Sequence, residues 1–239
     1  MNNIPVRCSD ITQLNKLVQV MLQLALTDIR KQGVNPFVVE TFRPQERQNY
    51  LYCQGRTITE ASAVGINNTF AKAYCNPKAG KVTWTLHSVH TSRKAIDLIP
   101  QRLINGKMTA IWNAQDPHTR IIINTMQKYG FEAGANWISS QDSPHFQVKG
   151  NYDEVFDCEH TNTYVTQAIQ KALNKVLNKA HSKTNNNTFN KPISKIITVD
   201  GIWGPLTTKA ITDFYQPLGL KLSHGQIDAE MLNALFLNL

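Results

Sequence analysis

The stretch SVHTSRKAIDL, residues 88–98, places His90 and Asp97 on either side of a cationic turn at the edge of an apolar run. The segment AIDLIP after the turn reads as a strand, and KVTWTLH before it alternates like a second strand. We therefore expect a hairpin in which His90 ends one strand and Asp97 faces it from the other. One histidine and one aspartate near a strand are common by chance, so a site requires further ligands.

A second stretch, DSPHFQ at residues 142–147, supplies those groups. A catalytic zinc site usually has three protein ligands of histidine or carboxylate type and one open position. His90, Asp97 and His145 would complete such a set. Asp142, three residues before His145, would then lie on a turn beside the metal, in the place of a base.

The composition is that of a globular protein, with 41% hydrophobic and 18% charged residues in a chain of 239. The longest apolar segment, Leu17–Leu26, contains Gln19 and Gln23 and is much shorter than the roughly 20 apolar residues that span a bilayer. No basic region precedes it and no small-residue cleavage site follows. We expect no stable membrane insertion, no signal peptide, and synthesis in the cytoplasm.

The formal net charge of +8 indicates a partner that carries negative charge. Nucleic acid, anionic lipid and the anionic bacterial wall all fit that sign. The basic residues are dispersed and no Arg/Lys-rich recognition helix stands out, which argues against nucleic acid. The four cysteines form no C-x-x-C pair, so we expect free thiols rather than a zinc ribbon.

The hydrophobic pattern predicts α+β architecture, a small antiparallel sheet with flanking helices, over residues 1–158. Helices are expected over 10–31, 44–54 and 117–129, and strands over 37–42 and 145–148, beside the two strands of the hairpin. The segment beyond Cys158 predicts a second, small all-α domain of three helices, residues 161–239. Its expected elements are a lysine-dotted helix (Tyr164–Ala180), an Asn-rich loop, a turn that leads into a helix, and a last helix capped by Asp228.

The motifs of the first domain resemble the zinc peptidases of bacterial wall metabolism, which include VanX-like and VanY-like D-alanyl-D-alanine peptidases and phage L-alanyl-D-glutamate endopeptidases. Their signature is S-x-H-x-x-G-x-A-x-D followed by D/E-x-x-H, and the chain offers Ser88, His90, Ala95 and Asp97 for the first half and Asp142 and His145 for the second. The stretches TFRPQERQNYLYCQGRT and GANWISSQDSPHFQ also resemble the endopeptidase branch. The resemblance covers roughly residues 20–150.

The resemblance implies a hedgehog-like fold, Zn²⁺ bound by His90, Asp97 and His145, and Asp142 as the base. It also implies that Arg43 is the cation beside the reacting carbonyl. Ser88 would orient the substrate.

One position departs from the family pattern, because Arg93 stands where the family has glycine. If that position requires a positive φ angle, the arginine costs on the order of 1 kcal/mol.

The stretch VDGIWGPLTTKAITDFYQ in the second domain resembles the peptidoglycan-binding three-helix module, with a D-G-x-x-G-x-x-T turn. Trp203 on that turn could stack on a sugar ring, although a tryptophan in so small a domain is more often part of the core.

Together these patterns predict a phage endolysin, a zinc endopeptidase that acts as a monomer on the L-alanyl-D-glutamate bond of peptidoglycan after release to the cell wall. A D-alanyl-D-alanine carboxypeptidase and a non-catalytic wall-binding protein are the alternatives.

Overall fold

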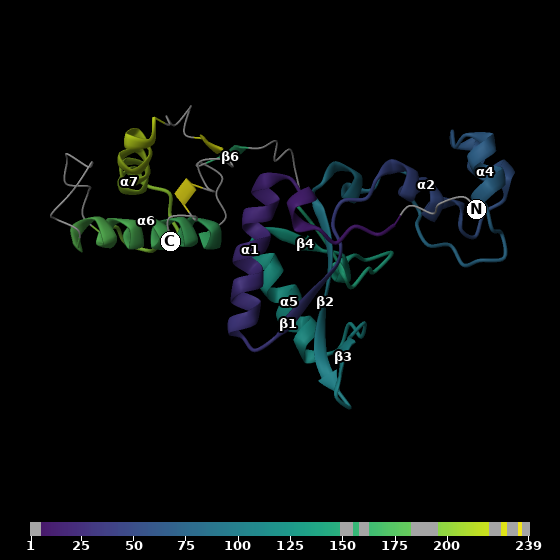
Figure 1. Cartoon of the computed structure of the whole chain (residues 1–239), viewed down its shortest axis with the longest axis horizontal. Coiled ribbons are helices and arrows are strands. Elements are labelled where there is room, and N and C mark those ends of the chain that lie inside the picture. Colours follow the sequence, from purple (N-terminus) through teal and green to yellow (C-terminus); the bar gives the residue numbers. More distant parts are fainter. Residues whose placement is uncertain are drawn as a thin grey trace.

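The computed structural model of the chain describes residues 6–148, 155–157, 163–182, 196–219, 226–228 and 234–235 (Figure 1). The helices are α1 Lys16–Lys31, α2 Gln45–Cys53, α3 Ile58–Ala63, α4 Asn68–Tyr74, α5 Pro117–Lys128, α6 Thr163–Ser182 and α7 Pro205–Tyr215, with short 3-10 turns η1 Ile11–Gln13, η2 Val89–Ser92, η3 Gly134–Asn136 and η5 Gln216–Leu218. The strands are β1 Asn35–Glu40, β2 Ala95–Ile104, β3 Lys107–Ala110, β4 Phe131–Ala133, β5 His145–Val148, β6 Val155–Asp157 and β7 Gln226–Asp228.

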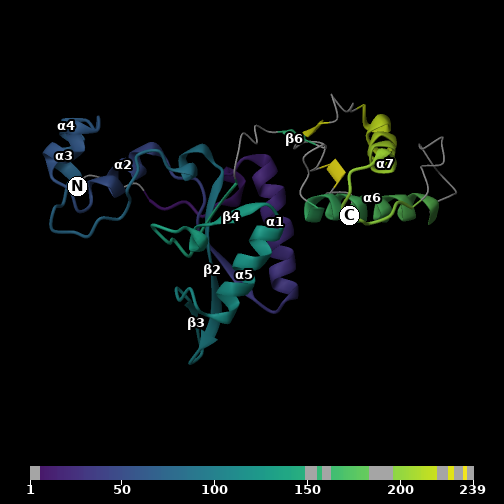
Figure 2. The ribbon, with the colours of Figure 1, turned by 180° about the vertical axis from the view of Figure 1, so that it is seen from behind.

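A five-stranded antiparallel sheet forms the center of the molecule, in the order β1-β2-β5-β4 with β3 paired to β2. Helices α1 and α5 run side by side over one face of this sheet, and the short helices α2, α3 and α4 form a lobe at one end (Figures 1 and 2). The predicted α+β class, a small antiparallel sheet with flanking helices, is confirmed.

The alternation of side chains along β2 and β5 separates the core from the opposite face of the sheet. Ile96, Leu98 and Phe146 point to the helices and join one buried apolar cluster with the inner faces of α1 and α5. Asp97 and His145 lie opposite each other on neighbouring strands and point the other way. Glu40 of β1 pairs with Asp97 from the other side, so three ionisable residues form one row across three strands.

The observed starts of the predicted helices α1 and α5 are set by capping side chains. Asp116 caps α5 by accepting a hydrogen bond from the His118 backbone N–H, as expected. The first helix begins at Lys16 rather than Asp10, because Asp10 caps the separate turn η1 and Asn15 caps α1. Both side chains bond backbone N–H groups that have no partner within their own helix.

The strand predicted over residues 81–87 is wrong, and with it the hairpin that would end at His90. The segment is irregular, and β2 pairs instead with β1, β3 and β5. Buried side chains take the carbonyl groups that a strand partner would use, since Arg56 donates to the Thr83 oxygen and Gln48 donates to the Thr85 oxygen. His90 therefore reaches the site from the turn η2.

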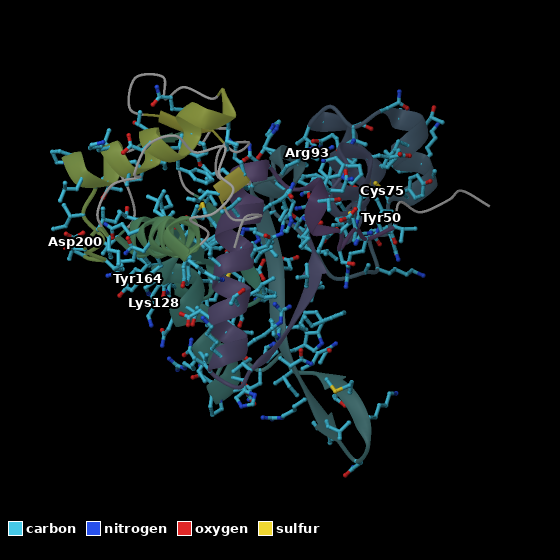
Figure 3. All side chains as sticks on the ribbon, turned by 60° about the vertical axis from the view of Figure 1, so that its left-hand side comes forward. Tyr50, Cys75, Arg93, Lys128, Tyr164 and Asp200 are labelled. Atoms are coloured by element: carbon cyan, nitrogen blue, oxygen red, sulfur yellow. The ribbon has the colours of Figure 1, made fainter. Side chains whose placement is uncertain are left out.

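Beyond the sheet, α6 and α7 occur where helices were expected, and β6 pairs with β7 in a two-stranded ribbon that was not predicted. The Lys128 ammonium group lies 5.9 Å from the ring center of Tyr164, where the end of α5 meets the start of α6 (Figure 3). Asp228, the expected cap of the last helix, is the last residue of β7. The Asn-rich loop and most of that helix fall outside the described residues. None of the helices in the described parts of the chain has the length and apolar character to cross a bilayer.

Candidate metal and catalytic site

Three side chains converge on the open face of the sheet. The Nε2 atom of His90 lies 3.2 Å from Oδ1 of Asp97, and Nδ1 of His145 lies 3.3 Å from the same oxygen. The two imidazole nitrogens are 3.2 Å apart, and the three ligand atoms all lie within 4.8 Å of one another. The predicted ligands His90, Asp97 and His145 are therefore brought together, and they form the sole such group of histidine, cysteine or acidic residues among those described.

Different elements supply these groups, and local sequence determines each position. Asp97 and His145 are direct cross-strand partners of β2 and β5. His90 lies in η2, whose first turn is capped by the Ser88 hydroxyl at 3.3 Å from the His90 backbone nitrogen. Arg93 ends η2 in the left-handed conformation with φ of 64°, and this turns the chain directly into β2. The positive φ expected for this position is thus present.

Each imidazole is oriented by a hydrogen bond on the side away from the cluster. His90 Nδ1 lies 2.6 Å from the Thr41 carbonyl oxygen, and His145 Nε2 lies 3.1 Å from Oε1 of Gln147. Gln147 in turn donates from Nε2 to Glu132 at 3.0 Å, which leaves its Oε1 to accept from the histidine. Sequence reasoning missed Thr41, Gln147 and Glu132. For Gln147 the available signal was its position two residues after His145, on the same face of a strand.

This arrangement fits a bound metal ion. With their outer N–H groups donating to Thr41 and Gln147, both imidazoles turn a lone pair toward the Asp97 carboxylate. Three hydrogen-bond acceptors this close together need a positive charge between them, either protons on the histidines or a metal ion. Two imidazoles and one carboxylate form a set of metal ligands typical of zinc. Where protons on the inner nitrogens supply that positive charge, burial works against the charged Asp97, yet the hydrogen bonds and charges of His145 and His90 hold its pKa well below the usual range.

Asp142 lies beside the cluster on the loop between η3 and β5. Partial removal from water and the negative charge of Asp97 raise the pKa of Asp142 above its ordinary value of 3.8. Its backbone N–H donates to the Gly134 carbonyl at 3.1 Å, and its own carbonyl accepts from the His145 N–H at 3.2 Å. Gly134 is needed at this contact, since an added Cβ would lie 2.5 Å from the Asp142 carbonyl oxygen. Asp142 is thus a carboxylate with raised proton affinity close to the predicted ligands.

Arg43 approaches the cluster from the segment between β1 and α2. Its Nη2 atom lies 2.6 Å from Glu40 and 3.7 Å from Oδ2 of Asp97, and its Nη1 donates to Gln48 at 2.9 Å. The Nε–H group is buried without a hydrogen-bond partner in the structure. A fixed guanidinium group, with one donor unused, therefore lies beside the predicted ligands.

An open cleft of about 580 Å³ borders these groups. Its lining includes Arg43, Asp142 and the ligands His90 and His145, with Ser88 at one wall, so the predicted site residues of the first domain share one cavity or its edge. The ring of Trp137 lies 5.1 Å from that of His145 and forms part of the same lining. Trp203 does not line it. The Trp203 indole N–H donates to Thr208 at 3.0 Å, and the ring packs partly against the buried core.

Comparison with known proteins adds a family match and two structural likenesses. Residues 81–148 match the model of a peptidase family described as D-alanyl-D-alanine carboxypeptidase. One similar structure is the Serratia marcescens L-Ala D-Glu endopeptidase ChiX, with 20% identity over 62% of this chain and 94% of that chain, and a TM-score of 0.37. The second is a mutant of the vancomycin resistance D,D-pentapeptidase VanY from a VanB-type resistance cassette in complex with Zn(II), with 20% identity over 56% of this chain and 71% of that one, and a TM-score of 0.34. The segment matched by the family model contains all three converging ligands and Asp142.

Proposed function

We propose that this protein is a zinc endopeptidase that degrades peptidoglycan by hydrolysing the L-alanyl-D-glutamate bond of the stem peptide. The observation that carries the proposal is the meeting of His90, Asp97 and His145 in one cleft with Asp142 and Arg43. These groups would supply a metal site, a base and a fixed cation, which together suit metal-assisted amide hydrolysis. The family model matched by residues 81–148 supports a peptidase that acts on the bacterial wall.

His90, Asp97 and His145 would hold the ion, and Thr41 and Gln147 would keep the two imidazoles in the ligating orientation. When bound, zinc would lower the pKa of a water molecule toward about 7 and polarise the scissile carbonyl group.

Asp142 would take a proton from the attacking water as its oxygen bonds to the carbonyl carbon. The place of Asp142 in the same cleft as the predicted ligands suits this role, because a base must lie within reach of the water that it deprotonates. When the C–N bond breaks, the same carboxyl group returns the proton to the leaving amine. Arg43 would stabilise the negative charge that develops on the carbonyl oxygen, because its guanidinium group is held beside the predicted ligands. Ser88, at the cleft wall, would orient the substrate.

The choice of endopeptidase over carboxypeptidase rests on Asp142, since the resemblance associates an aspartate base with the endopeptidase branch. The description of the matched family model favours the second candidate, a D-alanyl-D-alanine carboxypeptidase. Mass spectrometry of digested peptidoglycan separates the two. New amino-terminal D-glutamate supports our proposal, whereas release of free D-alanine with intact L-alanyl-D-glutamyl bonds would refute it.

A third possibility, a non-catalytic wall-binding protein, is tested by Asp142→Ala. We expect the variant to retain zinc and lose cleavage of isolated walls. Undiminished lysis would exclude Asp142 as the base.

We further propose that residues 161–239 bind peptidoglycan and concentrate the enzyme on its polymeric substrate. The charge of +8 would add attraction to an anionic wall. In this proposal the protein is a monomeric phage endolysin that reaches the wall after release from the cytoplasm. Sedimentation of the intact, metal-free chain with purified walls tests the binding step separately from catalysis.

A further inference from the structure

One buried side chain connects the catalytic cation to the wall of the cleft. Gln48 on α2 is fully buried. Its Oε1 accepts from Nη1 of Arg43 at 2.9 Å, and its Nε2 donates to the Thr85 carbonyl oxygen at 2.6 Å and to the Thr83 hydroxyl at 3.2 Å. The amide orientation is unambiguous, because a guanidinium group can only donate and a carbonyl group can only accept.

The segment held by Gln48 forms part of the cleft lining. Residues 82–85 line the cleft, with Val82 and Trp84 largely exposed, at 59% and 68%. The segment belongs to no strand, so its shape depends on side-chain bonds to its carbonyl groups. Arg56 holds the Thr83 carbonyl at 2.9 Å and Gln48 holds that of Thr85. The exposed apolar side chains are thereby presented to the cavity.

Arg43 is held from two directions. Glu40 binds its Nη2 atom, and Gln48 binds its Nη1 atom. Glu40 also accepts a hydrogen bond from Arg47 at 2.7 Å. Neither of these two bonds of Glu40 involves residues 82–85. Gln48 is thus the bond partner of Arg43 that also holds the cleft wall.

We propose that Gln48 is a positioning residue for cleavage, whose single amide group sets the spacing between Arg43 and the cleft wall at residues 82–85. The inference rests on the proposed function. A peptide that lies along this wall then presents its scissile carbonyl to a cation at a fixed distance. A displacement of the cleft wall would weaken substrate binding. A displacement of Arg43 would weaken stabilisation of the negative charge that develops during cleavage.

The test compares Gln48→Glu with Gln48→Met in the full-length, zinc-loaded enzyme acting on a soluble stem peptide. The glutamate keeps an acceptor for Arg43 and has no donor for Thr85, so we expect KM to rise about tenfold with kcat within about threefold of wild type. Methionine has neither group, and we expect kcat to fall as well, with kcat/KM reduced about 100-fold. Zinc content should stay at the wild-type value in both variants.

Gln54→Met is the matched control. Gln54 follows the last residue of α2, and its side chain bonds two carbonyl groups, those of Tyr50 and Tyr74, but it neither bonds Arg43 nor lines the cleft. Its kcat and KM should stay close to wild type. If Gln48→Met keeps wild-type kinetics, or if Gln54→Met reproduces its losses, Gln48 has no positioning role.

Hydrogen exchange separates this inference from the proposed function. The amides of residues 82–88 should exchange faster in Gln48→Met than in Gln54→Met or wild type, whatever the chain cleaves. If the wild type cleaves no peptide, the proposed function is refuted. Hydrogen exchange then still decides whether Gln48 connects Arg43 to residues 82–85. Unchanged exchange in Gln48→Met would overturn the inference even in an active enzyme.

Discussion

At the residue scale, Arg93 combines an unfavourable backbone conformation with favourable side-chain contacts. Its φ of 64° lies in the region where glycine is preferred, at a position between the predicted ligands His90 and Asp97. Its guanidinium group donates to the Gln13 carbonyl at 2.6 Å and lies 3.9 Å from the ring center of Phe42. These contacts attach η2 to the N-terminal segment and compensate for the strain of the turn.

Two substitutions at Arg93 separate these effects. Arg93→Ala removes the contacts and retains the strain, whereas Arg93→Gly removes both, so the glycine variant should be the more stable by about 1 kcal/mol. Urea unfolding of both variants measures the difference. Equal stabilities would mean that the turn relaxes when the arginine is absent.

Glu40 makes stability depend on pH. Burial disfavours its charge, but hydrogen bonds and charge interactions with Arg43 and Arg47 outweigh burial and lower the pKa of Glu40 below its ordinary value of 4.5. Because the folded pKa is the lower one, this stabilisation is present above about pH 4.5 and is lost as pH falls through the folded value.

We therefore expect Glu40→Gln to cost about 3 kcal/mol at neutral pH, since it removes the buried carboxylate that binds both Arg43 and Arg47. The difference in free energy of unfolding between Glu40→Gln and wild type should become smaller as pH falls below about 4.5. Urea unfolding at neutral pH and at about pH 3 checks this. A constant difference across that interval would contradict the assignment.

The residues of the site differ in how readily sequence reveals them. His90, Asp97 and His145 were placed together correctly, because histidine and aspartate at these spacings are a recognisable donor set. Thr41 was missed because it contributes a backbone carbonyl, which every residue possesses. Gln48 was missed because nothing in a single sequence distinguishes a buried glutamine from an exposed one.

At the scale of elements, the regular helices and strands were more predictable than the segments that carry the site. The helical spacing of apolar residues in α1 and α5, and the apolar run of β2, reflect burial of these elements in one core. These three elements were therefore predicted from the sequence. Residues 81–87 alternate like a strand, but Val82 and Trp84 are exposed, and the carbonyl groups of Thr83 and Thr85 bond Arg56 and Gln48 instead of a neighbouring strand. The short strands β3 and β4 have too few residues to show a period.

The turn η3 gives a prediction at this scale, because it packs against the loop of Asp142. A Cβ on Gly134 would lie 2.5 Å from the Asp142 carbonyl oxygen and 3.2 Å from the His145 Cβ atom. Gly134→Ala should displace the base and reduce kcat about tenfold or more, with a loss of about 1–3 kcal/mol in stability. Gly80→Ala is the control, since an added Cβ there meets nothing within 4 Å. Equal activities of the two variants would show that the loop shifts without consequence.

At the scale of the whole molecule, a bound ion should stabilise the fold as well as enable cleavage. Its three ligands come from η2, β2 and β5, so binding opposes unfolding of the sheet. Chelation should abolish cleavage and lower the melting temperature, and added Zn²⁺ should restore both. His145→Ala should lose this response. His87→Ala, a change at an exposed cleft residue outside the ligand set, should keep it.

Wall binding is the second property of the whole molecule. Trp203→Ala should weaken sedimentation with purified walls and leave hydrolysis of a soluble peptide unchanged. Trp112→Ala, at a tryptophan that is 57% exposed on the sheet domain, serves as the control. Equal sedimentation of the two variants would exclude Trp203 from wall recognition.

The row of Glu40, Asp97 and His145 across β1, β2 and β5 would make metal binding depend on the correct pairing of these strands. If β2 slipped by a single residue, Asp97 would be turned into the apolar layer and Ile96 would take its place among the donors. A misregistered molecule could not chelate, so titration with a colorimetric zinc indicator would count the correctly assembled fraction of any preparation.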